Sequence, residues 1–496
     1  MATTKLDKIV NRLRHYPFTE KILLCQTNAT RIMKTTHLDI FNTPNAIYPW
    51  ELEVFAELSL FADGSNPNKS FKAPMNNDFV KIINIIRNYR HSFLKKQKNM
   101  DFANAFIMVT GLQQFKSQEN ILHRIYRYNY FWNFANDKID MKKVFSGHFN
   151  GLEYGIFREL GVLIFFYASL ENTTPSVIQA LALKYIDAVN LLKITREDYK
   201  AQQSEKNDDN YENVIYGFNY LHPYPFVEYK GCLFLPLPYL IVDAVTESLL
   251  TRVTVDNALL REQIGKEVAQ SYIEKIFKDS GIYEEVLPET EYHVRKNKID
   301  SPDILIKQDE NFCFIDTKLS SPKLEIRKFN KEEIEKTTAR YAKNIIQMYK
   351  RITDFREGHY YPFVNKIDVS KDNLFGIVAL LEDSYISRRV IYEEVCKQLK
   401  IDSESEEAMF IKSHISITNF RDLEMFAFRC RDIFVSLKKK RDNPHQWNDL
   451  GLFNDELFSK IPAAKNFDLD TFITLNQKTI MESINYLVDN RVIKKS

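Results

Sequence analysis

The spacing of apolar residues changes along the chain, and this change limits the folds that the chain can adopt. Over residues 1 to about 200 the apolar positions recur every three or four residues; in residues 76 to 97, Phe79, Ile82, Ile83 and Ile86 share one helical face. From about residue 256, helical segments alternate with short runs that fit β-strands. The sequence therefore predicts an α/β protein with a mixed sheet, preceded by a mostly α-helical N-terminal region.

A polar segment separates these two regions. Residues 201 to 213 have no apolar period, so they are predicted to form a linker. Residues 220 to 242 are rich in proline and aromatic side chains, which favours short strands and turns over regular helix. We expect a helical recognition or regulatory region over residues 1 to 200, a linker with short strands over 201 to 255, an α/β domain over 256 to 435 and a helical C-terminal extension over 436 to 496.

The α/β domain is predicted to begin with a helix. Asp256 fits an N-cap, apolar residues recur every fourth position from Leu260 to Ile276, and Gly281 fits the helix C-terminus. Strands are expected over residues 283 to 295, 302 to 308 and 311 to 318. A long helix over residues 332 to 354, a central apolar strand over 374 to 382 and a further strand over 414 to 420 complete the pattern.

Composition excludes several classes of protein. With 44% hydrophobic residues and a net charge of +2 over 496 residues, the chain is neither disordered nor strongly basic. Its uncharged apolar stretches are too short to span a bilayer, and its five scattered cysteines lack any Cys-x-x-Cys pair. We expect a cytoplasmic protein without a membrane span. The chain lacks a Gly-x-x-x-x-Gly-Lys-(Ser/Thr) loop, so a nucleotide-driven or sensing step would need a partner protein.

One short motif stands out because of its surroundings. The tripeptide (Asp/Glu)-x-Lys occurs at residues 140 to 142, 198 to 200, 228 to 230 and 316 to 318, so alone it carries no meaning. Only Asp316-Thr317-Lys318 ends a predicted strand, whose alternation places Asp316 and Lys318 on one face. Pro302-Asp303 opens the preceding strand, and the turn between the strands returns Asp303 towards Asp316. The copy at residues 228 to 230 lacks a preceding Pro-Asp and is expected to be unrelated.

The predicted pair of carboxylates favours a metal site. Two carboxylates beside a core strand repel each other unless a cation neutralises them, and oxygen ligands suit Mg²⁺ or Mn²⁺. Such a metal accelerates phosphodiester hydrolysis by polarising the phosphoryl oxygen, activating water and neutralising the leaving oxygen, and Lys318 would add positive charge. The competing interpretation is a surface ion pair between Asp316 and Lys318, with Asp303 capping a turn.

These residues resemble a known family. Pro302-Asp303, followed thirteen residues later by Asp316-Thr317-Lys318 on the adjacent strand, with a helix on either side, resembles the PD-(D/E)xK nuclease superfamily, which includes many restriction and phage-defence nucleases. The resemblance covers residues 256 to 420 and implies a restriction-endonuclease-like core. It implies that Asp303, Asp316 and the carbonyl of Thr317 bind the metal, and that Lys318 positions or activates the attacking water.

The same resemblance implies two further catalytic residues on the flanking helices. Glu267, in the segment Ile264-Gly265-Lys266-Glu267, is the candidate acidic residue of the upstream helix, with Glu262 as its rival. Gln347 is the candidate glutamine of the downstream helix.

The downstream helix also carries a row of mostly cationic residues, which we call the basic row. Its members follow one another at spacings of four, three, four and three, beside a parallel apolar row. Residues 318 to 351 include ten Lys or Arg against four Glu. Phosphate contacts supply most nucleic-acid affinity, so we expect the cations to bind nucleic acid, and an ordinary solvated helix face is the alternative. The row comprises Lys336, Arg340, Lys343, Gln347 and Lys350.

Residues 123 to 134 interleave arginine with aromatic side chains. This composition fits a base-stacking surface, but Tyr126, Tyr130 and Phe134 also recur every fourth residue, as on a buried helix face. The buried helix is the favoured interpretation.

Together these features predict a Mg²⁺-dependent endonuclease that acts on DNA. A setting in restriction or antiviral defence rests on analogy with the family, because a fold does not dictate a function. One site per chain makes a homodimer attractive for cutting both strands. The alternatives are a repair or recombination nuclease, an RNase, and a non-catalytic nucleic-acid-binding or assembly protein with the same fold.

Overall fold

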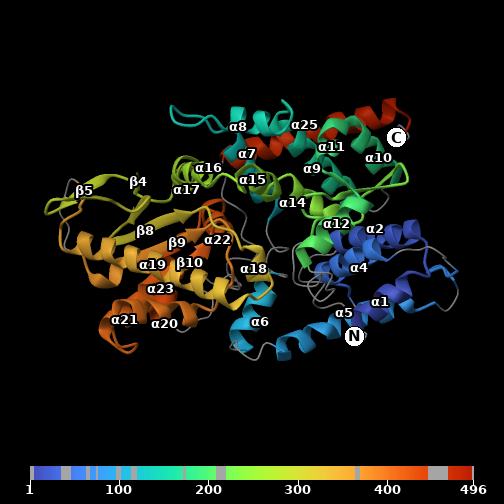
Figure 1. Ribbon diagram of the computed structural model, residues 1–496. Coiled ribbons are helices and arrows are strands. Elements are labelled where there is room, and N and C mark those ends of the chain that lie inside the picture. Colours follow the sequence, from blue (N-terminus) through green and yellow to red (C-terminus); the bar gives the residue numbers. More distant parts are fainter. Residues whose placement is uncertain are drawn as a thin grey trace.

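A computed structural model describes residues 5–34, 46–62, 68–73, 76–96, 102–112, 120–170, 175–207, 219–363, 369–444 and 467–493. The chain has a mixed α/β fold in which a five-stranded sheet flanked by helices forms one side of the molecule (Figure 1). Helices make up most of the other side. The mixed sheet and the helical N-terminal region agree with the sequence-based prediction.

The central sheet has the strand order β10-β9-β8-β7-β4. Strand β7 runs antiparallel to both of its neighbours, β4 and β8, whereas β8, β9 and β10 are parallel to one another. The predicted strand over residues 283 to 295 is divided, because its second half forms a separate hairpin with the residues that follow. The strands are β4 (Glu285–Pro288), β7 (Ile304–Gln308), β8 (Asn311–Lys318), β9 (Leu374–Leu380) and β10 (Ile415–Asn419), and the hairpin is β5 (Glu291–Val294) with β6 (Asn297–Asp300).

The helix predicted before the sheet is present. It runs as α16 (Ala258–Gln263), a π-helical turn η4 (Ile264–Ala269) and α17 (Gln270–Ser280). Asn257, rather than Asp256, caps its start, and its side chain accepts a hydrogen bond from the backbone N–H of Leu260 at 2.9 Å. Gly281 ends the helix with a φ of 65°, a left-handed conformation that glycine adopts without strain.

The long helix α19 (Lys331–Arg356) connects β8 to β9 and lies across one face of the sheet (Figure 1). It can approach β9 closely because that strand contains Gly376, where a Cβ atom would lie 2.6 Å from Cγ of Met348. Phe312, Phe314 and Leu305 belong to the apolar cluster on this face. Shorter helices complete the layer: α18 (Leu324–Arg327), α20 (Arg388–Leu399) and α21 (Glu406–His414), with the turn η5 (Lys371–Asn373) before β9.

The opposite face of the sheet shares its apolar core with a helical layer that spans both ends of the chain. Ile315 and Ile377 belong to the same cluster as Phe157 and Leu163 of α9. The predicted C-terminal extension includes a helix that returns to this layer, where Ser483 lies 3.0 Å from the hydroxyl of Tyr167. The elements are α7 (Ile121–Asn133), α8 (Met141–His148), α9 (Tyr154–Ser169), α10 (Pro175–Lys184), α11 (Ile186–Leu191), α22 (Phe420–Ala427), α23 (Ile433–Asp442) and α25 (Phe467–Asp489).

The arginine- and aromatic-rich segment is buried, as favoured from its spacing. It forms α7, where Tyr126 is 6% exposed and Arg127 is 3% exposed. Arg127 donates to both carboxylate oxygens of Glu424 on α22 at 2.6 and 2.7 Å, and the hydroxyl of Tyr272 donates to the same carboxylate at 2.6 Å. The base-stacking alternative is therefore wrong for these residues, which join α7, α17 and α22.

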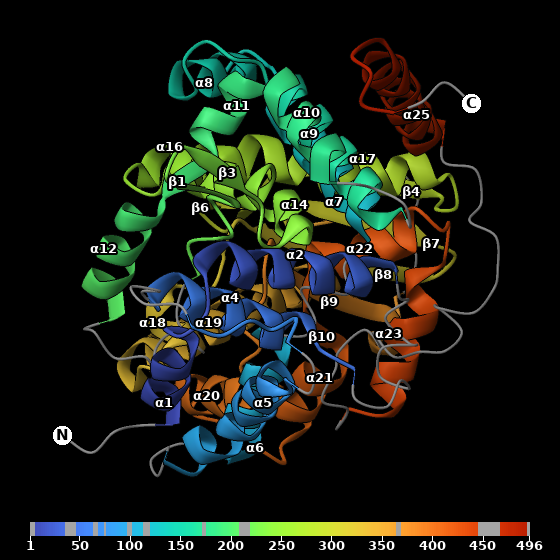
Figure 2. The same cartoon turned by 90° about the vertical axis from the view of Figure 1, so that its right-hand side faces the viewer.

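The first helices share an apolar core with a small three-stranded sheet. Helices α2 and α4 lie between the helical layer and α1 and α5 (Figure 2). The short strands expected within residues 220 to 242 are present as β2 and β3. Residues 201 to 207 of the predicted linker instead continue helix α12, and residues 208 to 213 lie outside the described residues. The elements are α1 (Lys5–Leu13), α2 (Phe18–Lys34), α4 (Pro49–Phe61), α5 (Asp78–Lys96), β1 (Lys193–Thr195), α12 (Arg196–Asn207), β2 (Phe226–Tyr229) and β3 (Cys232–Phe234).

One helix of the N-terminal region packs with the five-stranded sheet and α19. Helix α6 (Phe102–Thr110) contributes Met108 and Val109 to the cluster under α19. The side chain of Asn104 accepts a hydrogen bond from the backbone N–H of Ser387 at 2.8 Å. Within the described ranges, no helix is both long and apolar enough to cross a bilayer.

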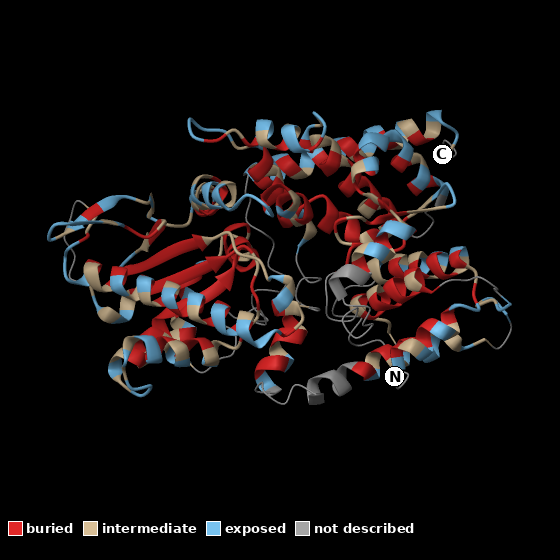
Figure 3. Cartoon of the chain, viewed as in Figure 1, coloured by how far each residue is buried: buried red, intermediate tan, exposed pale blue. Residues whose placement is uncertain are grey.

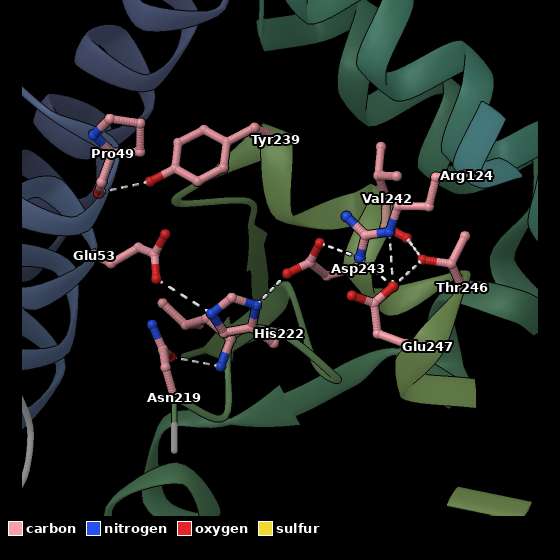
Figure 4. A network of polar contacts seen from close by, with 11 residues as sticks. Pro49, Glu53, Arg124, Asn219, His222, Tyr239, Val242, Asp243, Thr246 and Glu247 are labelled. Atoms are coloured by element: carbon pink, nitrogen blue, oxygen red, sulfur yellow. Dashed lines mark hydrogen bonds and ion pairs between the residues drawn. The ribbon is translucent and has the colours of Figure 1, made fainter. Parts of the chain in front are cut away.

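A chain of charged residues connects the N-terminal helices to the helical layer (Figure 4). His222 lies between two carboxylates, that of Glu53 on α4, 3.2 Å from Nε2, and that of Asp243 on α14 (Ile241–Ala244), which contacts Nδ1. Arg124 of α7 pairs with Asp243 and donates through Nε to Glu247 of α15 (Glu247–Thr254) at 2.7 Å. Nearby, Tyr239 of the 3₁₀ turn η3 (Pro238–Leu240) donates to the carbonyl of Pro49 at 3.1 Å.

This chain of charges makes stability depend on pH. Burial alone would lower the pKa of His222, but the carboxylates of Asp243 and Glu53 outweigh burial and raise the pKa to about 9. Because the folded pKa exceeds the value of about 6.5 for unfolded histidine, the stabilisation is complete below pH 6.5 and is lost as pH rises through 9.

We expect His222→Gln to lower the free energy of unfolding by about 2 kcal/mol at pH 6.5, because hydrogen bonds to charged groups are lost. The difference from the wild type should shrink above pH 9. Urea denaturation at pH 6.5 and at a pH above 9 measures both effects. The control is His293→Gln, which changes an exposed histidine. A difference between His222→Gln and wild type that does not change with pH would contradict the assigned charge of His222.

Candidate active site

The register of β7 and β8 brings the two predicted carboxylates together. Ile304 of β7 pairs with Ile315 of β8, which places Asp303 opposite Asp316 one residue further along. Alternation along β8 then directs Asp316 to the same face as Phe312 and Phe314, the face that α19 covers. The backbone N–H of Asp303 lies 3.4 Å from Oδ1 of Asp316. The hairpin therefore brings Asp303 and Asp316 side by side, as the sequence predicted.

Asp303 is fixed from two sides. Its Oδ2 accepts hydrogen bonds from the backbone N–H of Thr317 at 2.6 Å and from the Thr317 hydroxyl at 2.7 Å. Its carbonyl accepts a bond from Nε2 of Gln270 on α17 at 3.1 Å. The side chain of Asp303 is thus bonded to β8, and its backbone is bonded to α17, on the face of the sheet opposite α19. These contacts hold the carboxylate in one place.

Asp316 is fully buried and is paired with a residue that the sequence analysis did not identify. Nη1 of Arg351 on α19 lies 2.5 Å from both carboxylate oxygens of Asp316. Lys318 approaches the same carboxylate, with Nζ 3.7 Å from Oδ2. The side chain of Lys318 is 32% exposed and that of Arg351 is 10% exposed, so the two cations approach Asp316 from the solvent side and the protein interior respectively.

A signal for Arg351 exists in the sequence. It lies three residues after Met348 and four before Phe355, both buried under the sheet, so it falls on the apolar face of α19. A charged residue on such a face needs a buried partner of opposite charge.

The site contains two carboxylates and two cations. Burial raises the pKa of Asp303, and the negative charge of Asp316 raises it further, while Lys318 and the hydrogen bonds from Thr317 lower it. Arg351 and Lys318 match the two carboxylates in charge, although the pKa of Asp303 remains raised, to about 6. Charge balance alone does not require a metal ion at this position.

In the described part of the chain, the two expected catalytic residues on the helices form no hydrogen bond or ion pair with Asp303 or Asp316. Glu267 accepts hydrogen bonds from Nζ of Lys138 at 2.9 Å and from Nδ2 of Asn136 at 3.0 Å, and its rival Glu262 is exposed. Gln347 lies on the exposed face of α19. The α19 residue that contacts Asp316 is Arg351.

The donors available for a divalent cation are hard oxygen atoms. Asp303 and Asp316 supply carboxylates, and the carbonyl of Thr317 points to the same side as its N–H, which faces Asp303. These groups fit Mg²⁺ or Mn²⁺ by type. In the part of the chain that the structure describes, no group of three or more His, Cys, Asp or Glu is placed to hold a metal. A metal here would have to complete its shell with the carbonyl and water.

Much of the outward side of α19 is exposed (Figure 3), and the basic row consists of exposed residues of this helix. All five of its residues are exposed, which both the nucleic-acid interpretation and the solvated-face alternative require. Lys336 forms an ion pair at 2.6 Å with Glu332, one turn earlier. Such an exposed pair contributes little energy and can be exchanged for a phosphate.

A small cavity of about 40 Å³ lies just beyond the site, at the carboxyl ends of β9 and β10. Its charged lining holds equal numbers of cations and carboxylates, so it favours neither sign of ligand and is not part of the candidate site. The charged residues are Arg127, Arg327, Arg421, Glu247, Glu382 and Asp383.

The burial of Asp316 leads to a stability prediction. Asp316→Ala leaves Arg351 buried without its carboxylate, so we expect a loss of about 3 kcal/mol in the free energy of unfolding. Asp303→Asn should change it by less than about 1 kcal/mol, because the amide oxygen can still accept from Thr317 and the repulsion is removed. Urea denaturation followed by tryptophan fluorescence measures both.

The double variant Asp316→Ala/Arg351→Met provides the control for that prediction, because it removes the stranded cation. It should recover part of the stability lost in Asp316→Ala. Equal stabilities of Asp316→Ala and wild type would show that the pair contributes nothing.

Scans against family models and searches of curated proteins and solved structures find no match to this chain. What the site can do chemically therefore follows from its own residues and their geometry.

Proposed function

We propose that the protein is a metal-dependent nuclease that hydrolyses phosphodiester bonds of DNA, with a restriction-endonuclease-like core. The observation that carries this proposal is the pairing of Asp303 and Asp316 at the ends of adjacent strands, with Lys318 beside them at the solvent side. By analogy with the family that the motif resembles, the setting is restriction or antiviral defence.

The order of elements around the pair supports the proposed core. Helix α17 precedes the antiparallel strands β4, β7 and β8, and α19 then crosses to β9, parallel to β8. This is the sequence of helices and strands around Asp303 and Asp316 that the resemblance implies. This order of elements supports the fold alone, because the function of a protein depends on the side chains of its site.

The side chains have distinct roles in the proposed reaction. Asp303, Asp316 and the carbonyl of Thr317 would hold Mg²⁺ or Mn²⁺, which when bound supplies Lewis-acid polarisation of the phosphoryl oxygen. The partly exposed side chain of Lys318 places its ammonium group 3.7 Å from Oδ2 of Asp316, where it can orient a water or stabilise negative charge that develops in the transition state. Thr317 keeps the Asp303 carboxylate oriented through two hydrogen bonds.

The basic row supplies a surface for the substrate backbone. Lys336, Arg340, Lys343 and Lys350 project from the exposed face of the helix whose buried face carries Arg351, so they offer positive charge to a polyanion that lies along α19. The N-terminal helices would then recognise the substrate, a partner or an activating signal. A homodimer or a partner protein would be needed to cut both strands or to couple cleavage to a nucleotide.

A second candidate is a nucleic-acid-binding protein without catalysis. The observation that favours it is the pairing of Asp316 with Arg351, because a carboxylate already neutralised within the protein has less need of a metal. The basic row would serve this function equally well.

Plasmid cleavage separates the two candidates. Wild-type protein should nick or linearise supercoiled DNA with Mg²⁺ and not with EDTA. Asp303→Asn and Lys318→Gln should each lower the rate by about 100-fold or more, because a metal ligand or a charge-stabilising donor is lost. Both residues are only partly buried, so both variants should fold.

The matched control is Glu228→Gln. Glu228 belongs to a similar tripeptide but pairs with Lys193 at 2.8 Å in the small sheet, away from Asp303. Its cleavage rate should equal that of the wild type. Undiminished, Mg²⁺-dependent nicking by Asp303→Asn would exclude this site as the nuclease centre, and inactivity of the wild type with DNA binding intact would favour the non-catalytic candidate.

The basic row predicts a salt dependence. If Lys336, Arg340, Lys343 and Lys350 each meet one phosphate, they contribute about −3.6 to the slope of log affinity against log salt concentration. The fourfold Gln variant should lose that part of the slope while keeping its stability, because all four side chains are exposed. Fluorescence anisotropy with a duplex and Ca²⁺ measures binding without cutting. An unchanged slope would mean that the row is an ordinary solvated surface.

A further inference from the structure

We infer that Arg351 is a built-in counter-cation that competes with a divalent metal for Asp316. This inference rests on the proposed function, because it concerns the metal that the nuclease would use. It assigns to α19 a positioning residue that the resemblance to nucleases did not supply.

The geometry leaves little room on the carboxylate for a metal. Arg351 meets both oxygens of Asp316 at 2.5 Å, the N–H of Asp303 approaches Oδ1 at 3.4 Å, and Lys318 lies 3.7 Å from Oδ2. A carboxylate offers about four lone-pair directions in all. The hydrogen bonds from Arg351 and Asp303 occupy three of these directions, so a metal ion that binds both oxygens of Asp316 must displace a donor.

Arg351 is the donor with which a metal competes most directly. Its guanidinium contacts both oxygens, whereas Lys318 is further away and partly exposed. A guanidinium stays charged at every accessible pH, so it cannot reduce the competition by losing a proton. With Arg351 in place, a divalent ion also meets a full positive charge within a few ångströms in a poorly solvated site.

The same pairing explains how the carboxylate of Asp316 can be buried. Asp316 has no exposed surface, and an unpaired carboxylate there would be strongly unfavourable. Arg351 stabilises the buried carboxylate and thereby weakens its affinity for metal. Metal binding would then be measurable as the release of Arg351 from Asp316.

The test compares metal affinity in full-length variants, without nucleic acid. Isothermal titration with Mn²⁺ should show weak binding to wild type and binding at least about tenfold tighter to Arg351→Gln, a change of the size that outer ligands of metal sites produce. Arg351→Lys keeps a cation and should stay closer to wild type. Arg356→Gln removes the same charge from an exposed position of the same helix and should leave the affinity unchanged.

A second measurement uses the wild-type protein and does not depend on the folding of a variant. Phenylglyoxal labelling, mapped by mass spectrometry, should modify Arg351 slowly without metal and faster with saturating Mn²⁺, while labelling of Arg356 stays constant. Unchanged labelling of Arg351 at saturating Mn²⁺ would overturn the inference.

The outcomes separate this inference from the proposed function. Equal Mn²⁺ affinity of wild type and Arg351→Gln, with both binding and wild type cutting DNA, would overturn the role of Arg351 and leave the nuclease intact. Absence of Mn²⁺ binding in every variant, together with absence of cleavage, would overturn both. Tighter binding in Arg351→Gln without any cleavage would support the competition and contradict the nuclease.

Discussion

The ion pair between Asp316 and Arg351 is the contact on which the centre of this fold depends. Asp316 lies in a strand whose first seven residues are all buried, so its charge must be compensated within the protein. The compensating residue comes from α19, 35 positions later, and can reach Asp316 only if the helix lies close to the sheet. Gly376 permits that close approach, because any larger residue there would collide with Met348. The packing of α19 and the electrostatics of the site thus constrain each other.

The five-stranded sheet shares its apolar cores with helices from other parts of the chain, so it does not form a separate domain. Helices α7 to α11 precede the predicted linker, yet they share a core with the sheet and with the C-terminal helix α25. Helix α6 packs on the other face of the sheet, and the buried contacts of Arg127 with Glu424 join α7 to α22. The N-terminal helices up to about Lys96 form a core of their own. Residues of the small sheet also belong to this core. The helical layer therefore contacts the sheet directly.

The sequence was informative where the relevant contacts are local. The hairpin of β7 and β8 follows from alternation and a short turn, so the pairing of Asp303 with Asp316 could be predicted from thirteen residues of spacing. The helix before the sheet was recognisable from its apolar period and Gly281, although its N-cap shifted from Asp256 to Asn257. Arg351 was counted among the charges of a basic helix, because its partner is distant in sequence. Glu267 was chosen by motif position, and its partners Lys138 and Asn136 lie more than 100 residues away.

The two cations around Asp316 are not equivalent, and their difference bears on what the site can do. Arg351 lies inside, on a helix face packed against the sheet, where its positive charge compensates that of Asp316 and holds the carboxylate in place. Lys318 reaches the same carboxylate from the side that is open to solvent, so an incoming phosphate or water meets the ammonium group first. A purely structural ion pair needs only the inner cation. The outer one, at the end of the strand that also carries Asp316 and Thr317, is the feature that a structural role leaves unexplained and that phosphodiester chemistry would use.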